Sequence, residues 1–100
     1  MYRGTTPTFI LTVDGSVDLT EALHVYATFV QKSIKLTKTG SDLDVSSNQV
    51  DVYFNQAESL QFSTGAIMIQ LNWTYADGSR ACTDIISTTV DKNLEDGVLA

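Results

Sequence analysis

The chain of 100 residues is poor in cysteine, histidine and proline, with one residue of each, and it has no long apolar run. A single cysteine excludes an intrachain disulfide, and we expect Cys82, between Ala81 and Thr83, to be a small core side chain. No apolar stretch approaches the roughly 20 residues that a membrane-spanning helix needs. The segment after Met1 lacks the apolar region of a secretory signal peptide, so we expect a cytoplasmic protein that is not exported by the general secretory route.

Basic residues are also scarce, six against twelve acidic ones, and the net charge is −6. This balance opposes nucleic-acid binding, because a phosphate backbone demands clustered lysine and arginine. The only basic cluster is Lys32, Lys35 and Lys38, which we expect in a short solvated strand. At a sheet edge, Lys35 and Lys38 would guard that strand against pairing with another chain.

Catalytic groups are few, since His24 is the only histidine. In an expected strand it lies on the face opposite Leu23, Val25 and Phe29, which we expect to point inward. We expect it to face solvent or a partner, and a role as general base is the alternative. A hydrolytic triad would need a nucleophile, a base and an orienting acid together. The sequence indicates no such group, and we predict that the protein is not an enzyme.

Carboxylates gather near the expected turns. Asp42 and Asp44 flank Leu43 at same-face spacing, an arrangement that could hold a calcium ion. However, the segment lacks the ligand count of an EF-hand loop, and acidic residues at turns are usually solvated. We therefore predict neither a metal site nor a cofactor.

The clearest structural signal is an alternation of apolar and polar residues over 66–75. Its apolar positions include Trp73, which shares parity with Ile67, Ile69 and Leu71 and is therefore expected in the core. Asp77-Gly78 follows, the favoured centre of a tight hairpin turn. A second strand is expected over 81–90, so this part of the chain predicts a long antiparallel hairpin.

Shorter alternating runs fill most of the remaining chain. Asn55 followed by Glu58 predicts a capped helical turn near residues 55–60. Turn signals recur roughly every eight to twelve residues, which is typical of an antiparallel sandwich or a small barrel. We predict a single all-β domain over 1–100, an antiparallel immunoglobulin-like sandwich of about seven strands, with 23–30 and 67–75 central. The other strands are expected at 8–13, 33–38, 43–45 and 50–54.

Two tyrosines, Tyr26 and Tyr53, have the opposite parity to their core neighbours. Tyrosine is enriched at interfaces, so both are candidates for an exposed contact surface. Together with His24 and Lys35 they form the predicted interaction surface. A carbohydrate-binding module that uses the exposed tyrosines is the alternative.

Several short segments suggest a family. They are Arg3 to Phe9, which opens the first strand, Asp18 to Ala22 before the second, Tyr75 to Ser79 at the hairpin turn and Ile85 to Val90 beyond it. In these segments the chain resembles small prophage-encoded proteins of Gram-positive bacteria, and it is similar to the N-terminal β-sandwich domain of phage baseplate upper proteins. The resemblance implies a non-enzymatic structural module of a tail or baseplate assembly. It would bind further copies of itself or other phage structural proteins, and would be cytoplasmic before assembly and virion-associated after it.

Overall fold

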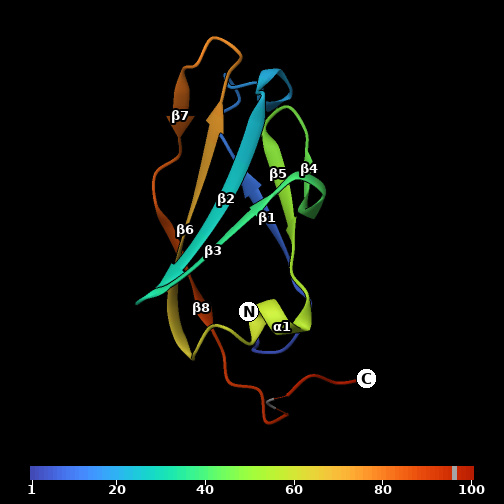
Figure 1. Ribbon diagram of the computed structural model, residues 1–100. Coiled ribbons are helices and arrows are strands. Elements are labelled where there is room, and N and C mark those ends of the chain that lie inside the picture. The colour runs from blue at the N-terminus through green and yellow to red at the C-terminus, as the bar shows by residue number, and fades with distance from the viewer. Residues whose placement is uncertain (96) are drawn as a thin grey trace.

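Two antiparallel β-sheets face each other in the computed structural model, which describes residues 1–95 and 97–100 (Figure 1). The large sheet has the order β3-β2-β6-β7, and β8 also pairs with β6. The small sheet has the order β1-β5-β4. In chain order the elements are β1 (Thr8–Thr12), η1 (Leu19–Glu21), β2 (His24–Gln31), β3 (Ile34–Thr39), η2 (Gly40–Asp42), β4 (Leu43–Val45), β5 (Gln49–Tyr53), α1 (Gln56–Ser59), β6 (Gly65–Thr74), β7 (Arg80–Cys82) and β8 (Ile86–Val90). The predicted all-β sandwich is confirmed.

The two strands with the strongest apolar alternation, β2 and β6, are the central pair of the large sheet, as predicted. Successive side chains of a strand point to opposite faces, so one parity of each strand fills the space between the sheets. Phe29 is opposite Ile69 and Ala27 is opposite Leu71 in the β2–β6 register, and all four are buried.

An aromatic cluster joins the two sheets. The ring of Phe54, which follows β5, is 4.8 Å from Phe29 and 5.2 Å from Phe9 between centroids, both in edge-to-face arrangements. Such pairs contribute roughly 0.5–1.5 kcal/mol each beyond their buried area. Trp73, 4% exposed, is in the core as predicted, and its indole N–H donates to the Tyr75 hydroxyl at 3.0 Å.

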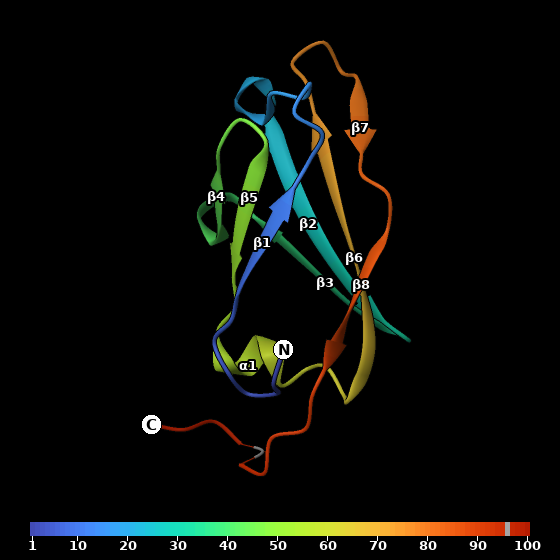
Figure 2. The same cartoon turned by 180° about the vertical axis from the view of Figure 1, so that it is seen from behind.

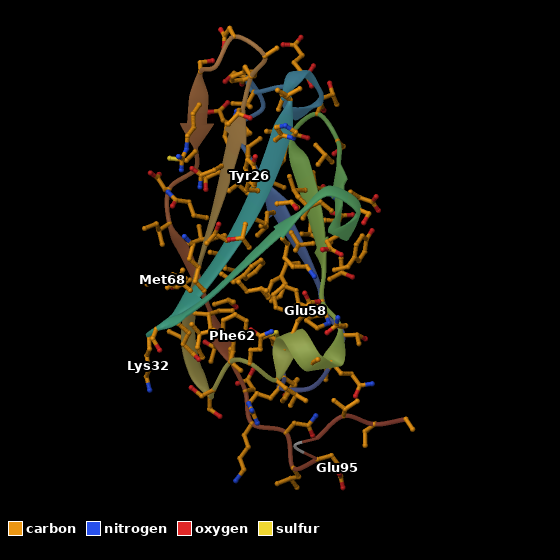
Figure 3. The ribbon with its side chains drawn as sticks, in the orientation of Figure 1. Tyr26, Lys32, Glu58, Phe62, Met68 and Glu95 are labelled. Atoms are coloured by element: carbon orange, nitrogen blue, oxygen red, sulfur yellow. The ribbon has the colours of Figure 1, made fainter. Side chains whose placement is uncertain are left out.

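One end of the sandwich is closed by α1, which lies beside the N-terminus (Figure 2). The predicted cap is present: Asn55 Oδ1 accepts from the Glu58 N–H at 2.8 Å, and Glu58 Oε1 accepts from the Asn55 N–H at 2.9 Å. Figure 3 shows Glu58 and Phe62 at this end of the molecule. Phe62 is fully buried, and Arg3 Nε donates to its carbonyl at 2.6 Å, which ties the N-terminal segment to this closure.

The hairpin turn is also as predicted at its centre. Gly78, at φ 88°, occupies the left-handed region that an L side chain rarely adopts, and its N–H donates to the Tyr75 carbonyl at 3.0 Å. The returning chain, in contrast, is two strands and not the single strand expected over 81–90. The structure therefore describes eight strands where about seven were predicted.

The break between β7 and β8 has a physical cause. The N–H of Thr83 donates to the Leu71 carbonyl, and the Thr83 hydroxyl accepts from the Leu71 N–H. Beyond this point β8 pairs with β6 in a register that differs by one residue from that of β7. One extra residue in a ladder is the mark of a bulge. Because Cys82 lies opposite the outward-facing Asn72, its side chain is exposed, and the prediction of a core cysteine is wrong.

Two further expectations on burial are wrong. Leu23, expected on the inner face of its strand, precedes β2 and is 59% exposed. The strand β3 is an edge strand as expected, but Lys38 does not guard that edge. Lys38 shares the inward parity of Ile34 and Leu36 and is buried, where its ammonium group pairs with Glu58.

Candidate interaction surface

Three of the four residues predicted for the interaction surface lie on the outer face of the large sheet. His24 and Tyr26 come from β2 and Lys35 comes from the neighbouring edge strand β3. Tyr26 is half-buried, whereas His24 and Lys35 are exposed. Figure 3 shows Tyr26 and Met68 on adjacent strands of this sheet.

Tyr26 forms a wall between two hollows. The first, about 350 Å³, lies on the sheet face and includes Lys35, Asn72 and Arg80 in its lining. The second, about 550 Å³, lies towards the small sheet, with His24 and Leu43 among its lining residues. The rings of His24 and Tyr26 are 6.2 Å apart between centroids. The surface thus combines one phenol ring, two basic side chains and several hydroxyl groups.

Arg80 and Asn72 belong to this surface but were missed in the sequence. Arg80 donates from Nε and Nη2 to Asn72 Oδ1 at 3.2 and 2.9 Å, which holds the guanidinium group against the sheet. The sequence could have predicted both positions. Asn72 has outward parity in β6, and the Asp77-Gly78 turn brings Arg80 back opposite Thr74. Hairpin register therefore places both side chains on the outer face.

The fourth predicted residue, Tyr53, lies elsewhere, on the outer face of the small sheet. Its hydroxyl donates to Asp44 Oδ2 on the adjacent strand β4. This hydrogen bond to a carboxylate raises the pKa of Tyr53 above its ordinary value. Tyr53 is therefore separated from Tyr26 by the thickness of the sandwich, and the two tyrosines do not form one surface.

The two sheets differ sharply in the charge of their strands. Within the strands that the structure describes, the large sheet holds the bases Lys35, Lys38 and Arg80 and no acid. The strands of the small sheet hold Asp44 and Asp51 and no base. Lys38 points inward, so the outer face of the large sheet presents Lys35 and Arg80, and the outer face of the small sheet presents the two aspartates.

The carboxylates weighed for calcium binding have separate partners. Asp42 lies 3.7 Å from the Lys38 ammonium, whereas Asp44 accepts the Tyr53 hydroxyl. Among residues 1–95 and 97–100, no group of three or more histidine, cysteine, aspartate or glutamate side chains is placed to hold a metal ion.

Comparison with protein-family models, curated proteins and solved structures finds no significant match. In the part of the chain that the structure describes, no helix is long and apolar enough to span a membrane.

Proposed function

We propose that the chain is a non-enzymatic interaction module that docks other proteins of a prophage tail or baseplate assembly on the outer face of its large sheet. The observation that carries this proposal is the convergence of His24, Tyr26 and Lys35 with Arg80 on one face. Tyrosine and arginine are among the residue types most enriched where partners bind tightly.

The sheet suits this task because it holds the side chains rigidly. Tyr26 lies on a central strand, with Thr39 opposite on one side and Asn72 opposite on the other. Residues on hydrogen-bonded strands lose little further conformational entropy when a partner docks. The partner favoured by two exposed bases is a protein surface that presents carboxylates or carbonyl oxygens.

The strand β3 offers a second mode of docking. It is an edge strand, so the backbone groups that do not face β2 remain open to a strand from a neighbouring chain. Its exposed Lys35 limits this pairing to partners that tolerate or neutralise a positive charge.

The phage setting is supported by the resemblance of the short segments in the sequence, and it calls for a genetic as well as a biochemical test. We would co-express the tagged chain with the products of the genes beside its own and purify it by the tag. We expect wild-type protein to retain a structural protein from this set. Tyr26→Ala should lose it, and Tyr53→Ala, the matched change on the opposite sheet, should keep it.

Two results would contradict the proposal. One is a strict monomer at high concentration that retains no neighbouring product, with no phage structural genes beside the coding sequence. The other is retention that is equally strong in wild-type protein and in Tyr26→Ala, since the docking face would then be elsewhere.

Carbohydrate binding is the second candidate function. It is favoured by the 350 Å³ hollow, in which a phenol ring lies beside the Asn72 amide and the Arg80 guanidinium. Three threonines, Thr28, Thr37 and Thr74, also line this hollow, so it offers a sugar several hydrogen-bonding groups beside one aromatic ring. On a glycan array, Tyr26→Ala should abolish binding and Tyr53→Ala should not. Equal binding by all three proteins would count against a sugar site at Tyr26.

A further inference from the structure

The two sheets carry opposite charges on their outer faces. This difference extends the proposed function, because it indicates the chemistry of a partner that the molecule would bind. The outer face of the small sheet is acidic and the outer face of the large sheet is basic. These faces lie on opposite sides of the sandwich, so they cannot meet within one molecule. They can meet between two copies.

On the acidic face, three residues form a row across the strands. Ile10 on β1 is opposite Asp51 on β5, which in turn is opposite Asp44 on β4. Like charges directly opposite each other on neighbouring strands are destabilising. Gln49 Nε2 donates to Asp51 at 2.9 Å and Tyr53 donates to Asp44, so both carboxylates are held in place beside each other. The apolar Ile10 next to them is 64% exposed.

On the basic face, a second row has the complementary order. Met68 on β6 is opposite Val30 on β2, which is opposite Lys35 on β3. Val30, Met68 and Ile85 contribute to the lining of a small hollow of about 80 Å³. Met68 and Ile85 are themselves exposed apolar side chains. An apolar hollow therefore lies beside a lysine, as an apolar side chain lies beside two aspartates on the other face.

We propose that copies of this chain associate head to tail, with the acidic face of one copy on the basic face of the next. Ile10 enters the hollow at Val30 and Met68, and Lys35 lies against Asp51 and Asp44. Each row spans three adjacent strands, roughly 10 Å across two strand spacings, so the rows match in width. The contact uses two different faces, which is the heterologous type that builds closed rings or open filaments.

This inference rests on the proposed function and names a second copy as the partner. The test is sedimentation velocity over a concentration series. We expect wild-type protein to form oligomers at low ionic strength and to dissociate at high ionic strength. Lys35→Glu and Ile10→Glu, each at an exposed position, should each weaken association by about tenfold or more, the effect of losing one close interfacial contact. Lys32→Glu and Leu94→Glu, matched exposed changes outside the two rows, should associate as wild type does.

A mixture of the two disabled variants gives the decisive result. The Lys35→Glu chain keeps its acidic face and the Ile10→Glu chain keeps its basic face, so together they should form a dimer and nothing larger. The two altered faces both carry an added glutamate and cannot bind each other. Recovery in the mixture also shows that both variants are folded.

Three outcomes would overturn the head-to-tail contact: wild-type protein that stays monomeric at low ionic strength, an Ile10→Glu variant that still associates fully, or a mixture that remains monomeric. None of these would by itself remove the proposed docking function. That function fails only if co-expressed partners are also not retained through Tyr26.

Discussion

Glu58→Gln isolates the charge of the buried ion pair at the α1 end of the sandwich. The Lys38 side chain is 4% exposed and that of Glu58 is 18% exposed. Glutamine is also a capping-box residue, so the substitution keeps the hydrogen bond to the Asn55 N–H and removes only the negative charge. The Lys38 ammonium is then left buried, with Asp42 at 3.7 Å as its remaining ionic partner.

The expected loss of stability follows from how deeply the Lys38 ammonium and the Glu58 carboxylate are buried. Removing one partner of a fully buried pair costs roughly 3–5 kcal/mol. Asp42 and the new amide oxygen compensate in part, so we expect Glu58→Gln to cost about 2 kcal/mol. Lys38→Met should cost less, about 1 kcal/mol, because the carboxylate that remains is less buried and keeps its bond to the Asn55 N–H.

The double variant gives the sharpest comparison. Methionine fills the volume of the lysine stem near the Phe54 ring, over which the ammonium lies at 5.5 Å. A buried ion pair replaced by neutral groups of similar size is often neutral for stability, so Lys38→Met with Glu58→Gln should be more stable than Glu58→Gln alone.

Urea unfolding followed by the fluorescence of the single buried Trp73 measures all three variants. The reasoning is refuted if Lys38→Met costs as much as Glu58→Gln or more. It is also refuted if the double variant loses the sum of the two single losses, because the charges would then not be coupled.

Three more predictions follow from burial and charge. Trp73→Ala should cost about 3–5 kcal/mol, measured by circular dichroism during urea unfolding, because a core indole leaves a cavity; a loss below about 1 kcal/mol would mean that the ring is not core. Partial burial raises the pKa of Glu58, but the hydrogen bonds from Lys38 and from the Asn55 N–H outweigh it, so the net pKa lies below the ordinary 4.5. The stability that this carboxylate contributes is therefore present above pH 4.5 and lost as pH falls through the lower folded pKa, and Glu58→Gln should flatten this acid limb. The pKa values of Asp14 and Asp77 are also lowered, so the stability of that variant should still decrease somewhat at acid pH. Cys82 should react with a thiol reagent in native buffer as fast as in urea, since it is exposed; protection in native buffer would place it in the core instead.

Strand periodicity was enough to predict the fold class and the central strands. Trp73 and its neighbours of equal parity in β6 are buried, because alternation over ten residues leaves one consistent inner face. The same reasoning failed for the segment 81–90, which was expected to be one strand and forms β7 and β8. The bulge at Thr83 shifts the register by one residue, and a one-residue shift reverses the face of every side chain beyond it. Side-chain hydrogen bonds such as that of Thr83 to the Leu71 N–H leave no mark in the apolar pattern.

The candidate surface could be predicted in part. Parity assigned His24 and Tyr26 to the face opposite the core residues of β2, and both lie there. Parity alone does not say which sheet a strand joins, so it grouped Tyr53 with Tyr26 although β5 belongs to the other sheet. Predicting that Arg80 lies on this surface requires the register of the hairpin, which follows from the turn geometry.

The two lysines of β3 explain how one short strand serves both the core and the surface. Lys35 and Lys38 are three residues apart, and an odd separation in a strand sends side chains to opposite faces. The inward Lys38 is tolerated because its ammonium pairs with Glu58, which the cap at Asn55 positions at the start of α1, and because Asp42 lies 3.7 Å away. The outward Lys35 is left without an acidic neighbour in any described strand of its own sheet. The same alternation that buries one charge therefore leaves the other exposed, and in the proposed head-to-tail contact the aspartates of a second copy receive it.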